Sequence, residues 1–428
     1  MADLNTLKSD LAAGAFRDQI AKLYIDPARV DCETNRYMSM LDKFTELFTE
    51  TDVHIFSAPG RSEIGGNHTD HQHGEVLAAS INDDAVAVAA AIDAPEIQLL
   101  SEGYPMLSFS IDNVEKIDAE EGTTTALIRG VVDGLKKNGH KVGGFHAYVT
   151  SEVLSGSGLS SSAAFETLIG TIESGLYNNM EIDAVEIAKI GQYAENYHFG
   201  KPCGLLDQMA CSVGSLVHID FADPTNPVVE QVVFDFEGAG YSLCITDTKG
   251  SHANLTDDYA AIPAECKSVA AYFGKDFLND VPEEDFMQAI PTLRAEGICN
   301  DRAIIRAIHF YGETKRAAGE AEALKSGDIQ KFFELFKKSG DSSYKYLQNV
   351  YTNHDVEHQN VSVGLAVSDT VLGANGIARV HGGGFAGTIQ AFVKNEAVAD
   401  YQAAMNHVFG EGACAVLKIR EFGGYQLV

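Results

Sequence analysis

The chain has 428 residues, enough for two domains, and its 45% hydrophobic and 21% charged content is typical of a globular protein with a large core. With 31 Lys and Arg against 61 Asp and Glu, its formal charge is −30. This balance argues against nucleic acid or an anionic membrane as a partner, because both attract basic surfaces. An acidic protein that binds a polyphosphate must neutralise it locally, with backbone N–H groups, a divalent cation or a few placed arginines.

The cysteines and the N-terminal residues indicate the compartment. The seven cysteines are odd in number and contain no Cys-x-x-Cys pair, so they indicate neither a disulfide framework nor a zinc site. The first residues, MADLN, lack the basic and apolar character of a signal peptide. The most apolar run, residues 85–92, is too short to cross a bilayer. We therefore expect a cytoplasmic protein.

Taken in order, the chain begins with about 50 polar residues of helical character and then changes to strands. A strand starts at Val53 and is predicted to break at the Ala-Pro-Gly of residues 58–60. Further strand-like runs cover residues 76–81, 85–92, 97–100 and 106–111. Leu127, Val131 and Leu135 predict one helix ending at Gly139, and another helix is expected over residues 183–197.

Residues 61–74, RSEIGGNHTDHQHG, place many polar groups directly after a strand, where binding residues commonly lie. His68, Asp70, His71 and His73 permit a metal site, but their spacing matches no common metal-binding pattern. Carboxylate, imidazole and amide groups can each bind a hydroxyl that both donates and accepts, so a hydroxyl-rich ligand suits the segment better. A solvated His-rich loop is the plain structural alternative.

Residues 155–164, SGSGLSSSAA, lie between an extended run (residues 144–150) and a helix whose apolar face carries Phe165, Leu168, Ile169 and Ile172. Glycines let the backbone approach a ligand closely, and free N–H groups with the helix dipole favour an anion. The chain has no Gly-Lys-Ser/Thr Walker ending, and Ser161 stands where a dinucleotide fingerprint needs glycine. The segment therefore predicts a nucleoside triphosphate site, with a serine-rich helix N-cap as the structural alternative.

Three segments together resemble the galactokinase family. Residues 61–74 are similar to its sugar-binding motif, residues 155–164 to its serine-rich phosphate loop, and residues 380–387, VHGGGFAG, to its third, glycine-rich motif. They occur in the family's order, and the similarity runs from about Val53 nearly to the C-terminus. Weaker matches are GQYAE at residues 191–195, CGLLDQ at 203–208 and SHANL at 251–255.

The resemblance implies a fold and a division into domains. Galactokinases belong to the sugar, homoserine, mevalonate and phosphomevalonate kinase superfamily. We expect its two-domain α+β fold, with a mixed sheet and helices like ribosomal S5 domain 2 in residues 1–215. Residues 216–428 are then expected to form a ferredoxin-like domain that carries the glycine-rich motif.

The resemblance also implies an activity and a set of site residues. The expected reaction is ATP-dependent phosphorylation of the anomeric hydroxyl of galactose to galactose 1-phosphate, with ATP and Mg²⁺ as cofactors. Asp207 is the expected general base, with Arg61 beside it. Ser162 and Glu195 are expected to hold magnesium. The expected sugar-binding residues are Asn67, His68, Asp70, Gly204 and Tyr259. The expected ATP-binding residues are Gly156, Ser157, Gly158, Leu159, Ser160, Ser161 and Ser162.

Departures from the family pattern leave the substrate open. The family glutamate before His68 is Asn67 here. Four other family residues also differ: asparagine is Glu63, tyrosine is His71, threonine is His381 and glycine is Ala386. An amide in place of a carboxylate near the C6 end of the sugar removes a negative charge, so a sugar altered at C6, such as galacturonate, is an alternative substrate.

Two further readings remain. A catalytically inactive galactose-sensing regulator is the alternative of another class. Such regulators lose residues of the serine loop, whereas this chain keeps the loop, Glu195 and Asp207. Mevalonate and homoserine kinases lack the His-x-Asp sugar motif. As partners we expect only a small sugar and ATP, with the chain a monomer or small homo-oligomer.

Overall fold

The structure, a computed structural model, describes residues 3–153, 158–251 and 255–428. These residues form two compact units: unit 1 comprises Met1–Arg61, Ala79–Ser215 and Lys418–Val428, and unit 2 comprises Ser62–Ala78 and Leu216–Leu417. The sequence prediction instead used a single cut after residue 215. The observed division is discontinuous because strands β1 (His54–Gly65) and β2 (Glu75–Ile92) each run through a boundary between the units.

Unit 1 is a sheet with helices on both faces. Its helices are α1 (Leu4–Ala13), α2 (Arg17–Tyr24), α3 (Val30–Leu47), α4 (Thr124–Lys137), α5 (Ser161–Asn178), α6 (Ala184–Tyr193) and α7 (Leu206–Val213). Its other strands are β3 (Glu96–Ser101), β4 (Leu107–Ser110), β5 (Gly144–Ser151) and β12 (Tyr425–Gln426). The strand order is β12-β1-β2-β5-β3-β4, with β3 and β5 parallel and the β12–β1, β2–β5 and β3–β4 pairs antiparallel.

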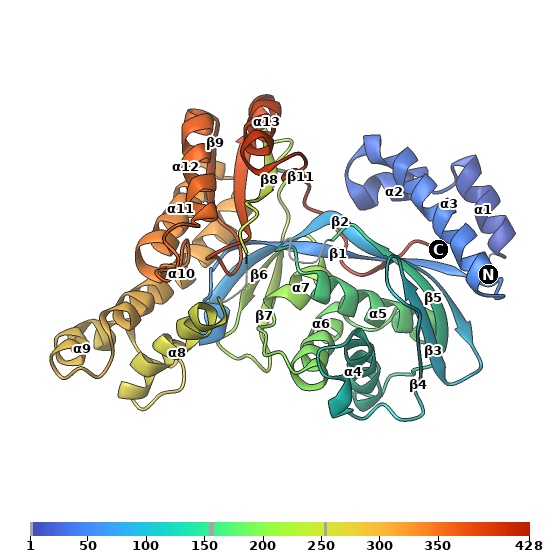
Figure 1. Ribbon diagram of the computed structural model, residues 1–428, viewed down its shortest axis with the longest axis horizontal. Helices are drawn as coiled ribbons and strands as arrows, with labels where there is room; N and C mark the ends of the chain where they lie inside the picture. The colour runs from blue at the N-terminus through green and yellow to red at the C-terminus, as the bar shows by residue number, and fades with distance from the viewer. Residues whose placement is uncertain (1–2, 154–157, 252–254) are drawn as a thin grey trace. The chain divides into compact units, whose positions relative to one another are not determined.

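Strand β2 divides the core of unit 1, because successive side chains of a strand point to opposite faces. Ala85, Ala87 and Ala89 pack with residues of α4, α5 and α6 in one cluster. Val86 and Val88 pack with α1, α2 and α3 in another. Figure 1 shows the same arrangement, with the blue helices α1–α3 on one face of the sheet and the green helices α4–α7 on the other.

The strands depart from the sequence prediction at two places. β1 does not break at residues 58–60 but continues to Gly65, and all but its first residue are buried. The runs predicted at residues 76–81 and 85–92 form one strand, because the polar Asp84 between them is buried and paired rather than placed in a turn. The predicted helices are confirmed as α4, α5 and α6, the last continued by a π-helical turn at Ala194–Phe199.

Unit 2 is built on a four-stranded antiparallel sheet of order β11-β8-β10-β9. Its strands are β6 (Leu216–Asp220), β7 (Val228–Val232), β8 (Tyr241–Asp247), β9 (Gly376–Val380), β10 (Thr388–Lys394) and β11 (Cys414–Leu417). Its helices are α8 (Thr256–Tyr272), α9 (Glu283–Ala295), α10 (Asp301–Lys325), α11 (Ile329–Ser342), α12 (Asn360–Leu372) and α13 (Val398–Phe409). β6 pairs with β2 and β7, and both units mix helices with sheets, which confirms the predicted α+β class.

Candidate active site

The phosphate segment lies in unit 1, between β5 and α5. Gly158 and Ser160 have positive φ angles of 74° and 63°, and Ser160 is the N-cap of α5. A non-glycine residue in this left-handed region is uncommon and carries strain, which clusters at functional sites. A Cβ atom on Gly60 of β1 would lie 2.8 Å from the carbonyl oxygen of Leu159, so the strand passes directly beneath the loop. The predicted ATP-binding residues Gly156 and Ser157 lie outside the described residues.

Asp207, at the start of α7, accepts three hydrogen bonds in this region. Arg61 donates from Nε to Oδ1 at 2.6 Å and from Nη2 to Oδ2 at 2.8 Å. The Ser160 hydroxyl donates to Oδ2 at 2.6 Å, and Arg61 Nη1 reaches the Gly158 carbonyl at 2.5 Å. Desolvation raises the pKa of Asp207, but the Arg61 charge and these hydrogen bonds outweigh it and hold the pKa below its usual value. The carboxylate is therefore ionised and oriented beside the phosphate segment.

Glu195 occupies the π-helical turn Ala194–Phe199, and its carboxylate is buried. Ser162 Oγ donates to Oε1 at 3.3 Å, and Lys201 Nζ contacts the same oxygen at 3.0 Å. Gln208, the residue after Asp207, donates from Nε2 to Glu195 Oε2 at 2.9 Å and to Glu166 Oε2 at 3.1 Å. Burial, and then the Glu195 charge, raise the pKa of Glu166 well above its usual value. Two alternate serines of the loop, 160 and 162, thus each bind one of the two predicted acidic residues.

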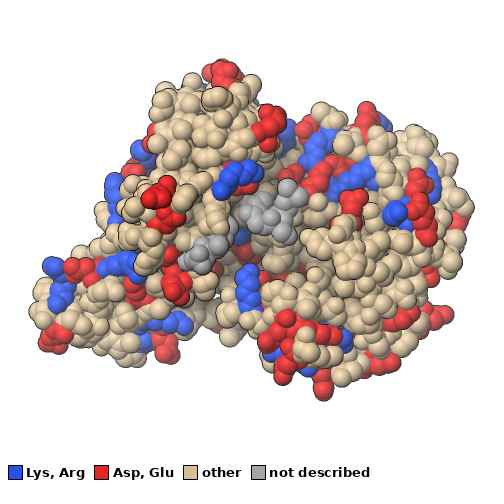
Figure 2. Space-filling view, viewed as in Figure 1, with Lys and Arg blue, Asp and Glu red and all other residues tan. Residues whose placement is uncertain are grey.

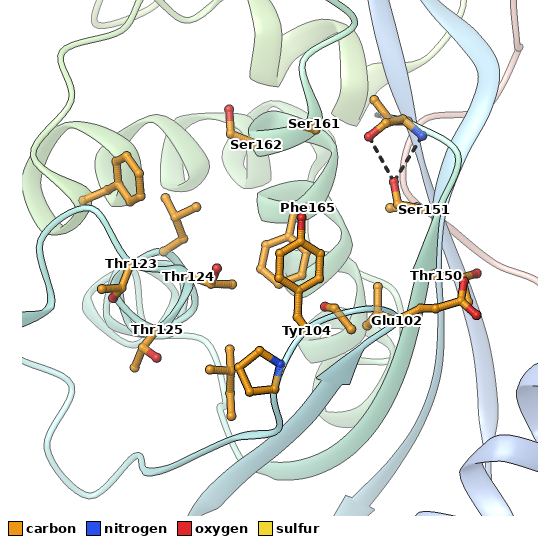
Figure 3. A pocket seen from close by; sticks show the side chains of 18 of the residues that line it. Glu102, Tyr104, Thr123, Thr124, Thr125, Thr150, Ser151, Ser161, Ser162 and Phe165 are labelled. Carbon is orange, nitrogen blue, oxygen red and sulfur yellow. Dashed lines mark hydrogen bonds between the residues drawn. The ribbon is translucent and has the colours of Figure 1, made fainter. Parts of the chain in front are cut away.

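A pocket of about 710 Å³ in unit 1 is lined by Ser161 and Ser162. Ser161 and Ser162, at the start of α5, and Thr123–Thr125, at the start of α4, line this pocket, as Figure 3 shows from close by. The aromatic rings of Tyr104 and Phe165 also line it. The pocket therefore combines two helix N-termini, which favour an anion, with an aromatic and apolar wall.

Unit 2 carries the predicted sugar residues other than Gly204, which lies in unit 1 two residues before α7. Asn67 is fully buried, and its amide is bonded on every side. Nδ2 donates to Glu63 Oε1 at 2.8 Å and to the Gly382 carbonyl at 2.7 Å; Oδ1 accepts from Asn349 at 2.8 Å and Ser343 at 3.2 Å. These bonds fill the capacity of an amide. A sugar contact by Asn67 stays a prediction, and it would require one of these bonds to be exchanged.

His68 and Tyr259 converge on the glycine-rich turn of unit 2. His68 Nε2 is 3.1 Å from the Gly383 carbonyl, and the Tyr259 hydroxyl donates to the Gly384 carbonyl at 2.8 Å. A Cβ on Gly384 would lie 2.0 Å from the Asn349 carbonyl oxygen, so this position requires glycine. Burial, and then the neighbouring His71, lower the pKa of His68 to about 3, so the imidazole is neutral. A neutral imidazole and a phenol therefore bind adjacent carbonyls of this turn.

Asp70 and His381 have local roles in the structure. Asp70 begins a short 3-10 turn and accepts a hydrogen bond from the His71 backbone N–H at 2.9 Å. His381, in place of the family threonine, is buried and bonds to Ser62 and Thr388. Among the described residues, no group of three His, Cys, Asp or Glu side chains is arranged to hold a metal ion.

Sequence reasoning missed Lys201 and gave no role to Gln208 or Glu166. Gln208 and Glu166 stand inside or beside the recognised motifs, one residue after Asp207 and four after Ser162, and this proximity was the available signal. Lys201 precedes the CGLLDQ segment by one proline and carried no such signal. Lys201 is one of 31 Lys and Arg residues in the sequence, and on the face shown in Figure 2 basic side chains stand among acidic ones.

Comparison with known proteins assigns the chain to a family. The galactokinase galactose-binding signature matches residues 42–91, and the GHMP kinase N-terminal domain matches residues 126–215. A galactokinase of Glaesserella parasuis serovar 5 is 31% identical over 367 residues, covering 83% of this chain and 89% of the relative. A galactokinase of Streptomyces coelicolor is 28% identical over 381 residues, covering 89% and 95%.

Solved structures agree with these relatives. The galactokinase of Lactococcus lactis, complexed with galactose, is 26% identical and superposes with a TM-score of 0.75, covering 90% of this chain and 98% of that chain. The mevalonate kinase of Methanococcus jannaschii, 16% identical with a TM-score of 0.61 over 86% and 98% of the two chains, shares the fold. Within the described ranges, no helix is long and apolar enough to pass through a membrane. The motifs, the fold and the extent of these similarities show that this chain belongs to the galactokinase family.

Proposed function

We propose that this protein transfers the γ-phosphoryl group of ATP to the anomeric hydroxyl of galactose, giving galactose 1-phosphate and ADP. The observation that carries the proposal is the pairing in unit 1 of Ser160 with Asp207 and of Ser162 with Glu195. Phosphoryl transfer depends chiefly on positioning and on neutralising charge spread over the transferred group. One short loop therefore contacts both Asp207, the proposed base, and Glu195, the proposed metal ligand.

ATP is proposed to bind with its phosphates at the loop and its base in the pocket of about 710 Å³. The N-termini of α4 and α5 both border that pocket and supply N–H groups and positive dipole ends. In a protein with a formal charge of −30, this arrangement neutralises the phosphates locally and does not require a basic surface. Tyr104 and Phe165 offer aromatic faces to the base.

Magnesium is proposed to bind at Ser162 and Glu195. Their oxygens, Oγ and Oε1, lie 3.3 Å apart and are the hard donors that Mg²⁺ prefers, so the residues fit the ion. When bound, the ion neutralises charge on the β- and γ-phosphates. The chain holds this donor pair in place through Gln208, which fixes the other carboxylate oxygen, Oε2.

Asp207 is proposed to accept the proton of the anomeric hydroxyl as that oxygen attacks the γ-phosphorus. The ion pair keeps the carboxylate charged at neutral pH, ready to accept the proton, and two of its lone-pair directions are engaged by Arg61. The Arg61 guanidinium then stabilises negative charge that grows during the transfer.

The sugar is proposed to be held by Asp70, His68, Tyr259, Gly204 and Asn67. The Lactococcus lactis relative was solved with galactose, and galactose is the substrate proposed here. Glu63 lies 2.8 Å from the Asn67 amide, so unit 2 retains a carboxylate beside the position of the missing family glutamate. Arg379 pairs with the same Glu63 oxygen at 3.2 Å, so this carboxylate is neutralised within unit 2 and does not by itself exclude a negatively charged sugar such as galacturonate.

An inactive sugar sensor is the rival function. Loss of the loop serines or of the acidic residues would favour it, but Ser160, Ser162, Glu195 and Asp207 are present and in contact as pairs. We place the reaction in the cytoplasm, where a kinase with seven free thiols meets ATP and a reducing environment. Its partners are then the two small substrates, with the chain as a monomer or small homo-oligomer.

The test is ADP release with ATP and Mg²⁺ in the presence of galactose, N-acetylgalactosamine, galacturonate or glucose. We expect ADP release to require a sugar and to be fastest with galactose, and we expect ³¹P spectra to show an anomeric phosphate. Binding of galactose without ADP release would establish the sensor instead. Faster turnover of galacturonate would reassign the substrate.

A further inference from the structure

The carboxylate of Glu195 is 2% exposed, and the side chains around it divide its two oxygens between them. Oε2 accepts from Gln208 Nε2 at 2.9 Å, and Gln208 is itself fully buried. Oε1 accepts from Ser162 Oγ at 3.3 Å and from Lys201 Nζ at 3.0 Å. Oε1 is therefore the oxygen that faces the phosphate loop, and it also contacts the ammonium group of Lys201.

Lys201 makes two hydrogen bonds to Glu195, one from its side chain and one from its backbone. Besides the side-chain contact, the Lys201 backbone N–H donates to the Glu195 carbonyl at 3.1 Å, closing the turn that follows the π-helical residues Ala194–Phe199. The chain between the two residues therefore holds Lys201 at this place whatever its side chain does. The side chain itself is 63% exposed, so the ammonium can leave Oε1 for solvent without opening the core.

The charge balance explains why the ammonium is there. A buried carboxylate without a counter-charge is costly, on the order of several kcal/mol. Gln208 and Ser162 donate hydrogen bonds to Glu195 but carry no charge. Among the ion pairs of the described residues, Lys201 is the cation that contacts Glu195. Lys201 thus supplies the positive charge that this carboxylate needs when no metal is bound.

We propose that Lys201 is the internal counter-ion of Glu195 and that a divalent cation must displace its ammonium from Oε1 in order to bind. The proposal rests on the proposed function, in which Ser162 and Glu195 hold Mg²⁺. Two cations on one carboxylate oxygen repel each other, so binding of the metal and the Lys201 contact exclude each other. Lys201 therefore sets the metal concentration that the protein requires, and it keeps Glu195 charged and oriented until the metal arrives.

The experiment measures metal binding directly, with Mn²⁺ as the probe, from the loss of the free Mn²⁺ electron paramagnetic resonance signal. Wild-type protein, Lys201→Met, Lys136→Met and Glu195→Gln are titrated without nucleotide or sugar. Lys136 is an exposed lysine at the end of α4, so its variant matches the change in net charge. The Mn²⁺ binding that Glu195→Gln abolishes defines the site, which separates it from weak binding to the acidic surface.

We expect Lys201→Met to bind Mn²⁺ at the Glu195-dependent site about threefold more tightly than wild type, the size of one partly exposed ion pair. Lys136→Met is expected to match wild type. Unchanged or weaker binding by Lys201→Met would overturn the proposal. A second readout is thermal unfolding: Lys201→Met is expected to unfold at a lower temperature than wild type in EDTA, and the difference is expected to shrink with saturating Mn²⁺.

The outcomes distinguish this proposal from the proposed function. If Glu195→Gln leaves Mn²⁺ binding unchanged, Glu195 is not the metal ligand and the counter-ion proposal falls with that assignment. Galactose-dependent ADP release by the wild-type protein is a separate measurement, and it is unaffected by which residue holds the metal.

Discussion

The Arg61 guanidinium donates two hydrogen bonds to the Asp207 carboxylate, at 2.6 and 2.8 Å. It donates a third hydrogen bond to the Gly158 carbonyl at 2.5 Å. A planar guanidinium matches a carboxylate in a way that a lysine ammonium cannot. Arg61 therefore orients Asp207 and fixes the phosphate loop at the same time, which joins the proposed base to the proposed phosphate site.

We expect Arg61→Lys to lower kcat about 100-fold although the positive charge is kept, because the two-pronged contact and the loop contact are lost. Steady-state kinetics with varied ATP and galactose measure the effect. Circular dichroism spectra of the variant provide the control for folding. A kcat within threefold of wild type would show that charge alone suffices and that the geometry is not required.

Ser160 has two separable roles, one in its hydroxyl and one in its backbone. Both Ser160→Ala and Ser160→Gly remove the hydrogen bond to Asp207, so we expect turnover to fall about tenfold in each, as for a bond to a charged group. Only glycine relieves the left-handed φ of 63°, so we expect Ser160→Gly to be about 1 kcal/mol more stable than Ser160→Ala. Urea denaturation measures this difference. Equal stabilities, or full activity of the glycine variant, would contradict the assignment.

The neutral imidazole of His68 makes stability depend on pH. In the unfolded chain the ring takes up a proton near pH 6.5, whereas in the folded protein its pKa is lowered to about 3, chiefly by burial. Between these values the unfolded state binds more protons, so the free energy of unfolding falls as the pH falls, by at most about 1.4 kcal/mol per pH unit for this group.

We expect His68→Asn to show a shallower loss of stability than wild type between pH 6.5 and pH 5, in urea denaturation at each pH. The matched control is His407→Asn, which replaces an exposed histidine of α13 and is expected to retain the wild-type slope. If stability falls with pH as steeply in His68→Asn as in wild type, the His68 imidazole of the folded wild-type protein does not have a lowered pKa.

Asp84 is the centre of a buried charge cluster that anchors α3 to the sheet of unit 1. It accepts hydrogen bonds from Arg36 at 2.8 Å, Tyr24 at 2.8 Å and Arg420 at 3.2 Å. We expect Arg36→Met to lower the free energy of unfolding by about 3–5 kcal/mol, because it leaves part of a buried charge unpaired. Urea denaturation followed by circular dichroism measures the loss.

The control for this cluster is Arg17→Met, which removes the exposed Arg17–Asp31 pair. We expect a change within about 0.5 kcal/mol, because exposed ion pairs contribute little. Equal effects of the two substitutions would show that the Asp84 cluster does not stabilise the fold.

The Asp84 cluster also explains why the sequence did not predict β2 as a single strand. Asn82, Asp83 and Asp84 separate two of the predicted strand-like runs, yet β2 passes through them as one strand. The groups that donate hydrogen bonds to Asp84 come from α2, α3 and the C-terminal segment, far away in the sequence. Local pattern predicts turns from polar residues, and only tertiary pairing can place such residues inside a strand. The helices α4, α5 and α6 were predictable because their apolar periodicity is local.

The candidate site divides in the same way. The phosphate segment and the acids Glu195 and Asp207 were predicted because each lies in a short segment that resembles a galactokinase motif. The pairing of Ser160 with Asp207 and of Lys201 with Glu195 was not, because hydrogen bonds between separate elements leave no periodic trace in the sequence. Asn67 was recognised in the sequence as a replacement for the family glutamate. Its hydrogen-bond partners, which include Glu63 and Asn349, could not be predicted from the sequence.

The most direct test of the account is the Asp207→Asn variant, with turnover and nucleotide binding measured on the same preparation. Because the substitution removes the proton acceptor but keeps the shape of the side chain, we predict that the dissociation constant for ATP changes by less than threefold. We predict that galactose-dependent turnover falls at least about 100-fold, the low end for loss of a general base. Turnover within threefold of wild type would contradict the claim that Asp207 accepts the proton.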